Sequence, residues 1–159
     1  MLEAGTPQYI SRLADAQATY TAKRIQMSEE YASVSDAVRH HKFGAACDTI
    51  DGKMHCPFTK SMSDADIAAQ SDPLALPDSV LVPNDFPYAL ELPIRHEVIW
   101  TRVPLHGDPA RVQRLIETYF PADKWHLLSL VNPPYLQTIK DIFHIHVFVK
   151  PKEQIKTDT

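Results

Sequence analysis

The chain has 159 residues, of which 44% are hydrophobic and 23% are charged, and this composition is typical of one globular domain. Only four residues are Gly, and the two nearest, Gly44 and Gly52, are too far apart to form the glycine cluster of a dinucleotide-binding loop or a P-loop. The net charge is -4 and basic residues form no stripe, so we expect no nucleic-acid partner. The chain also has no long apolar run, and we therefore expect no membrane partner.

Residues 1–44 are predicted to be helical. From Pro7 to about Glu30, apolar residues recur at spacings of three, four and seven, which is the pattern of one helix face. A second helix is expected from Ser33, a capping residue, to Gly44, which suits a helix C-terminus. We expect both helices to be packing scaffold.

Residues 45–93 are rich in Pro and are predicted to be irregular, with one short helix at Ser63–Gln70. So long a loop in a compact domain either carries function or wraps the surface of the core, and the sequence leaves both open.

Residues 94–150 predict three strands and one helix. The β-branched and aromatic content indicates strands, and Asp108 with Pro109 begins the helix that Pro121 ends. The strands are expected at His96–Val103, Trp125–Val131 and Phe143–Lys150. The order strand, helix, strand, strand predicts an α+β fold in which a helix packs on one face of a small antiparallel sheet, within a single domain of residues 1–159.

Cys47 and Cys56 can form at most one disulfide. Because the start of the chain does not look like a signal peptide, we expect a reducing cytoplasmic location. Cys47, His55 and Cys56, with His40 and His41 nearby, all have metal-binding side chains, but their spacing matches no standard zinc motif. We therefore expect a loop with reduced thiols rather than a metal site.

The segment Phe143–Val149 is the most informative for function. Because side chains alternate across a strand, Phe143, Ile145, Val147 and Val149 should face the core, while His144, His146 and Phe148 face the other way. Two imidazoles on one strand face can bind a metal with His96 or His126 as a further ligand, or act on a phosphorus centre. They can also be ordinary strand residues with hydrogen-bonding neighbours.

Four motifs together resemble the family of N-acetylglucosamine-induced proteins. These are Asn84-Asp85-Phe86-Pro87-Tyr88, then Ile94-x-His96-x-Val98-x-Trp100-Thr101, then Val131-Asn132-Pro133, and finally Leu136-Gln137-Thr138-Ile139 leading into His144-x-His146-Val147. The helical start, with Tyr31-x-Ser33-Val34-x-Asp36, is similar as well. This resemblance implies a family and no reaction.

The order of His96, Asn132, Gln137 and the His144-x-His146 pair is also similar to the histidine-triad superfamily of nucleotide hydrolases and transferases. The resemblance implies that His146 is the nucleophile on phosphorus and His144 its supporting partner. It further implies phosphate or ribose contacts from Asn132 and Gln137, with His96 across the sheet. Phe148 stands where the third histidine of that motif would be.

The sequence thus favours a hydrolase or transferase of nucleoside phosphates or phosphoramidates, using a strand histidine and neither metal nor cofactor. The expected partners are a small phosphorylated ligand and a second copy of the chain in a homodimer. Two alternatives stay open. One is a binding module for a small anion, a sugar phosphate or a protein segment, and the other is a metal site at the same histidines.

Overall fold

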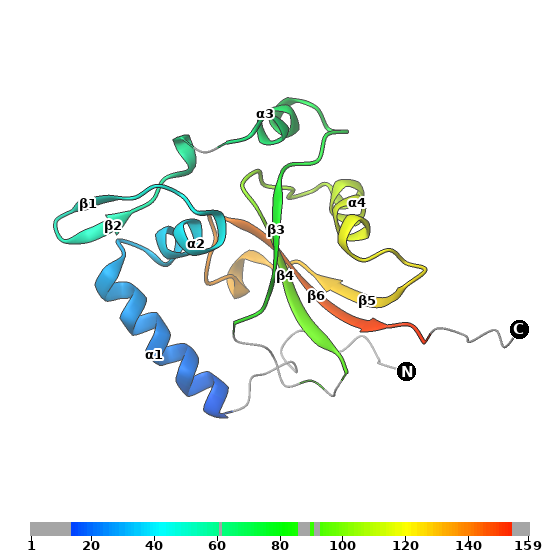
Figure 1. Cartoon of the computed structure of the whole chain (residues 1–159), viewed down its shortest axis with the longest axis horizontal. Coiled ribbons are helices and arrows are strands. Elements are labelled where there is room, and N and C mark those ends of the chain that lie inside the picture. Colours follow the sequence, from blue (N-terminus) through cyan, green and yellow to red (C-terminus); the bar gives the residue numbers. More distant parts are fainter. Residues whose placement is uncertain (1–13, 61, 86–89, 91–92, 154–159) are drawn as a thin grey trace, which may run out of the picture. The chain divides into compact units, whose positions relative to one another are not determined.

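The computed structural model describes residues 14–60, 62–85, 90 and 93–153, which group into two compact units (Figure 1). The N-terminal unit is Met1–Ser61 with Asn84–Leu92, and the C-terminal unit is Met62–Pro83 with Pro93–Thr159. The expected single domain stays a prediction. Helices and a mainly antiparallel strand arrangement confirm the α+β class.

The N-terminal unit contains helices α1 (Ala14–Glu30) and α2 (Val34–Phe43), as the sequence predicts. The start expected at Pro7 lies outside the described residues. Ser33 caps α2, because its hydroxyl oxygen accepts a hydrogen bond from the Asp36 N–H at 3.1 Å. Gly44 ends α2 with a φ of 63°, a left-handed conformation that glycine adopts without a steric penalty.

A β-hairpin follows α2, where the sequence predicts an irregular segment. Strands β1 (Asp48–Ile50) and β2 (Lys53–His55) pair antiparallel, with Asp48 opposite His55. Asp51 and Gly52 both have positive φ, 50° and 78°, as a two-residue type I′ turn requires. The expectation was wrong because an Asp-Gly pair is a hairpin signal even between strands this short.

The C-terminal unit is built on a four-stranded antiparallel sheet of order β3-β4-β6-β5 (Figure 1). Its strands are β3 (Ser79–Pro83), β4 (Arg95–Thr101), β5 (Trp125–Leu130) and β6 (Phe143–Pro151). Strand β3 was not expected, and it adds an edge to the three predicted strands. The short helix α3 (Asp64–Ser71) begins at Ser63 with a capping box to Asp66, close to the predicted bounds.

One face of this sheet forms the hydrophobic core with helix α4 (Pro109–Tyr119). Ile99 of β4 and Ile145 of β6 are fully buried against Leu115 and Ile116 of α4. The alternation of β6 therefore places its apolar residues as predicted. Since each fully buried Leu or Ile contributes roughly 1.5–3 kcal/mol, this face holds β6, and with it the histidines on the opposite face, at fixed positions.

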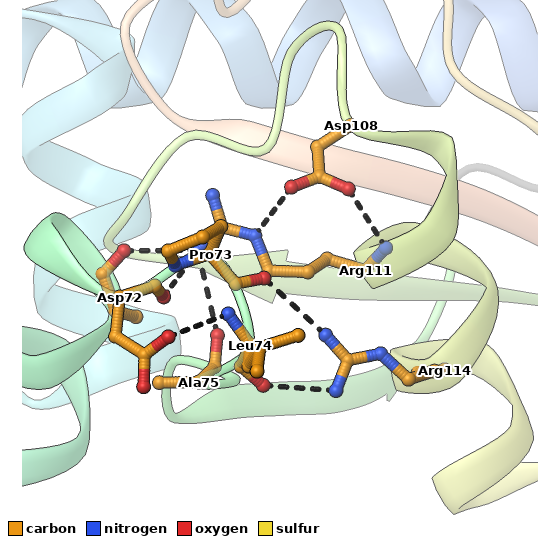
Figure 2. A network of polar contacts seen from close by, with 8 residues as sticks. Asp72, Pro73, Leu74, Ala75, Asp108, Arg111 and Arg114 are labelled. Carbon is orange, nitrogen blue, oxygen red and sulfur yellow. Dashed lines mark hydrogen bonds and ion pairs between the residues drawn. The ribbon is translucent and has the colours of Figure 1, made fainter.

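Two arginines of α4 bind carbonyl groups in the last turn of α3 and in the segment that follows it (Figure 2). Arg111 Nη1 donates to the carbonyl oxygen of Ala69 at 2.9 Å and to those of Asp72 and Ala75 at 3.4 Å, while its Nε donates to Asp108 at 2.7 Å. Arg114 donates to the carbonyl oxygen of Leu74 at 2.8 Å. A segment without regular secondary structure thus has its carbonyl groups satisfied by guanidinium groups.

Candidate functional site: a histidine cluster on one sheet face

The face of the sheet opposite α4 carries His96, His144 and His146. In the register of β4 with β6, Trp100 pairs with His144, Val98 with His146 and His96 with Phe148, so all six side chains share this face. The three histidines are buried, with exposed fractions of 5% for His96 and 8% for each of the others. The predicted grouping of these imidazoles is found in the structure.

A chain of hydrogen bonds favours one tautomer of neutral His146. Asn132 Nδ2 lies 3.3 Å from His146 Nε2, and an amide nitrogen can only donate, so Nε2 accepts and carries a lone pair. Neutral His146 then has its proton on Nδ1, which lies 2.9 Å from His96 Nε2 and donates to it. The two neighbours of His146 therefore hold it in one tautomer.

His144 is held in the complementary way, by the backbone. Its Nδ1 lies 3.0 Å from the carbonyl oxygen of Ile142, an acceptor only, so Nδ1 carries the proton. Burial lowers the pKa of His144 below 6.5, His106 nearby lowers it too, and the hydrogen bond to Ile142 opposes both. His144 is thus neutral at neutral pH, with a lone pair on Nε2.

Trp100 adds a hydrogen-bond donor to this face that sequence reasoning did not assign to it. Its ring centroid lies 4.6 Å from that of His144. Its Nε1 is buried and has no hydrogen-bond partner among the described residues. Buried donors are nearly always satisfied, so this N–H is a candidate ligand contact. Only the strand register, which pairs Trp100 with His144, identifies it.

Of the other predicted site residues, Asn132 and Gln137 lie at or near the histidine cluster, whereas His126 does not. Asn132 contacts His146 directly, whereas Gln137 donates to the Asn132 carbonyl oxygen and so acts on the loop that carries Asn132. His126, weighed as a metal ligand, is exposed and pairs with Lys150, away from the cluster. Among the described residues, the one group of three metal-binding side chains is His40, Cys47 and Cys56, not the strand histidines.

The expectation of reduced thiols is overturned, because Cys47 and Cys56 form a disulfide. The type I′ turn of the hairpin places the two residues opposite each other, one step beyond the Asp48–His55 pair. The spacing of Cys47 and Cys56 in the sequence does not predict this disulfide unless the hairpin between them is recognised.

None of the helices in the described part of the chain is long and apolar enough to cross a membrane. The expected cytoplasmic location and homodimer stay predictions.

Comparisons with known proteins identify a yeast relative and a solved structure of similar fold. The uncharacterized protein YPL067C of Saccharomyces cerevisiae is 31% identical over an alignment of 94 residues, and the match covers 46% of this chain and 48% of that protein. The chain therefore spans about half the length of this yeast relative. A solved structure described as the crystal structure of HTC1 matches with a TM-score of 0.54 at 21% identity, over 88% of this chain and 75% of that one, and shows a shared fold.

The resemblances to the N-acetylglucosamine-induced proteins and to the histidine-triad superfamily stay predictions. The family described as a protein of unknown function, DUF3605, matches residues 1–150, and the chain belongs to this family.

Proposed function

We propose that the chain is a phosphorus-transfer enzyme, a hydrolase or transferase of nucleoside phosphates or phosphoramidates with His146 as the nucleophile. The observation that carries the proposal is the hydrogen-bond chain from Asn132 through His146 to His96. It places the lone pair on Nε2, and the Asn132 amide that donates to this nitrogen must move aside before Nε2 attacks phosphorus.

In the proposed reaction, His146 Nε2 attacks the phosphorus atom, and the bond from phosphorus to the leaving oxygen or nitrogen breaks. The leaving atom keeps the electron pair and takes up a proton from solvent. Water, or an acceptor hydroxyl, then attacks the same phosphorus and breaks its bond to Nε2, losing a proton and restoring neutral His146. His96 Nε2 accepts the Nδ1 proton of His146 in a hydrogen bond, so it stabilises the positive charge that the attack places on the ring.

Two neighbours suit the phosphoryl group. Trp100 offers a buried N–H without a partner among the described residues, and the ring centroid of His144 lies 5.4 Å from that of His146. A neutral indole N–H donates to a phosphate oxygen without requiring a buried cation. His144 serves as the supporting residue that the motif order implies.

A binding module without turnover is the second candidate. Phe148 occupies the third position of the motif, and its ring packs against His96 with centroids 4.4 Å apart. An apolar ring at this position cannot exchange a proton with a leaving group, whereas it does not prevent an anion from binding.

The test is product release from a panel of nucleoside phosphates and nucleoside phosphoramidates by the purified chain. We expect His146→Ala to abolish turnover, and His126→Ala, an exposed histidine of the same sheet, to retain it. Quenching the reaction in alkali and measuring the intact mass should detect the phosphorus adduct on His146, because phosphoramidate bonds to histidine survive in base.

Equal background rates for the wild-type chain and His146→Ala would overturn the proposal. A ligand that raises the melting temperature of the wild-type chain but is never turned over would select the binding module instead. At a ligand concentration of about 100 times Kd the gain in stability should be about 2.7 kcal/mol.

A further inference from the structure

A second cluster of reactive side chains lies in the N-terminal unit, where the proposed reaction makes no use of it. One ligand atom each from His40, Cys47 and Cys56 lies within 4.8 Å of the other two. Cys56 is fully buried, and the other two are half-buried. His40 comes from the last turn of α2, and the two cysteines flank the hairpin β1–β2.

The hairpin brings the two sulfur atoms to one face. Cys47 precedes β1 and Cys56 follows β2, so they continue the ladder in which Asp48 is opposite His55. Their Cα atoms are 4.2 Å apart, close to the spacing of a non-hydrogen-bonded antiparallel pair. Because side chains alternate, His55 belongs to the opposite face of the hairpin from Cys56.

Other contacts hold this cluster in place whether or not the sulfur atoms are bonded to each other. The Tyr31 hydroxyl lies 2.7 Å from His40 Nδ1 and 3.1 Å from His41 Nε2, and Tyr31 itself is buried. The Cys56 N–H donates to Asp36 Oδ1 at 2.7 Å, which ties the end of β2 to the first turn of α2. His40 and Cys56 are therefore positioned by interactions that do not depend on the disulfide, and Cys47 directly precedes the paired strand β1.

We propose that these residues form a redox-controlled zinc site, in which His40 and the thiolates of Cys47 and Cys56 bind one Zn²⁺ and water takes the fourth position. The disulfide must first be reduced by a thiol reductant. Two reductant thiols supply two electrons and two protons, the sulfur–sulfur bond breaks to give two thiols, and the reductant leaves as its own disulfide. Binding of Zn²⁺ then releases both thiol protons.

The donor set selects the ion. Two sulfur donors and one imidazole favour Zn²⁺ over the hard ions Mg²⁺ and Ca²⁺, which prefer oxygen ligands. Imidazole has two nitrogen atoms, so His40 can keep its hydrogen bond to Tyr31 while the other nitrogen binds the ion. Metal-binding histidines are commonly oriented by such an outer hydrogen bond, and Tyr31 provides it here.

The disulfide form and the zinc form exclude each other, because the same two sulfur atoms serve both. Oxidation of the zinc form returns the disulfide and releases the ion, with the two electrons passing to an oxidant such as a small-molecule disulfide. Zinc occupancy of the N-terminal unit therefore reports the thiol redox state around the protein.

The experiment compares the full chain, purified without a histidine tag, in its oxidised form and after anaerobic reduction. Zn²⁺ is titrated against a competing chelator, and Co²⁺ serves as a spectroscopic substitute whose absorption reveals tetrahedral thiolate ligation. We expect one ion per chain after reduction and none in the oxidised form. Hydrogen peroxide added to the zinc form should release the ion, as measured with a chromogenic chelator.

Variants test whether His40 and Tyr31 contribute to zinc binding, or whether the two thiols alone bind the ion. His40→Asn should weaken zinc affinity strongly, Tyr31→Phe should weaken it by about 10- to 100-fold, and His55→Asn, on the other face of the hairpin, should leave it unchanged. Zinc affinity of the reduced chain that is the same in His40→Asn as in the wild type would overturn the site. Failure of the reduced wild-type chain to bind Zn²⁺ or Co²⁺ would overturn it too, and this measurement does not depend on any variant folding.

Discussion

His96 Nε2 lies 2.9 Å from His146 Nδ1, although the two residues are not directly opposite in the sheet. In the register, His96 faces Phe148 and His146 faces Val98, so the contact runs diagonally between β4 and β6. Diagonal neighbours on one sheet face are within reach of long or aromatic side chains. The contact joins a residue before the α4 crossover to one after it, 50 positions apart.

The first prediction concerns His96 as a positioning residue for His146. Replacing His96 by Ala removes the acceptor for the His146 Nδ1 proton, so only the Asn132 contact at Nε2 then favours this tautomer. In the proposed reaction, kcat should fall by about 100-fold, the size of effect expected when a reacting group is misplaced, while KM changes little.

His96→Gln is the matched variant, because its side-chain oxygen can accept the same proton. It should recover much of the lost kcat, whereas a purely structural role for His96 would leave Ala and Gln equally impaired. Nitrogen-15 NMR of His146 gives a readout without substrate. The wild-type chain should show the proton on Nδ1, and a weaker preference for Nδ1 in His96→Ala is the expected change.

The second prediction is a pH dependence of stability that comes from His144. Burial holds its pKa in the folded chain below the ordinary value of 6.5, so the unfolded chain takes up the proton first as the pH falls. Well above pH 6.5 both states are neutral and His144 contributes nothing. Below it, the free energy of unfolding should decrease by at most about 1.4 kcal/mol per pH unit until the folded-state pKa is passed.

Urea unfolding of the wild-type chain and His144→Asn across pH 5 to 8 measures this contribution. The variant should show a shallower loss of stability on acidification, and the difference in slope should vanish above pH 7. Parallel curves for the two proteins would show that His144 is not the group involved.

The sequence predicts most of the C-terminal unit because its patterns are strong and local. The alternation in Phe143–Val149 places Ile145 and Val147 in the core, and the capping residues locate the helices within a few positions. Strands β1, β2 and β3 are short and have no fully buried residue, so they lack such a pattern. Only the Asp-Gly turn signals the hairpin.

The candidate site is predictable only in part, for the same reason. Strand alternation alone places His144 and His146 on one face. The hydrogen bond from His146 to His96 and the placement of Trp100 beside His144 depend on the register between two strands joined by a long connection. Such a register is fixed by the whole sheet and its core, and no local pattern encodes it.

The third prediction concerns the Arg111 network of Figure 2. Arg111 is mostly buried, and its removal leaves carbonyl groups such as that of Ala69 without a donor. Arg111→Ala should therefore lower the free energy of unfolding by about 1 to 3 kcal/mol, measured by urea titration.

Arg114→Ala is the matched control, because Arg114 also donates to carbonyl groups of this segment but is exposed. Water replaces its hydrogen bonds, so the change in stability should stay within about 0.5 kcal/mol. Equal losses for the two variants would mean that burial of the guanidinium group does not decide its contribution.

The fourth prediction links the disulfide to stability. The bond closes a loop with a sequence separation of 9, so reduction should lower the free energy of unfolding by about 2 to 3 kcal/mol through the greater freedom of the unfolded chain. If the reduced form binds Zn²⁺, adding the ion at about 100 times its Kd should restore about 2.7 kcal/mol. Urea unfolding of the oxidised, reduced and zinc-loaded chains measures all three stabilities.

The double variant Cys47→Ser, Cys56→Ser is the control, because neither the reductant nor Zn²⁺ should then change its unfolding. A reduced, metal-free chain as stable as the oxidised one would show that the cross-link does not constrain the unfolded state.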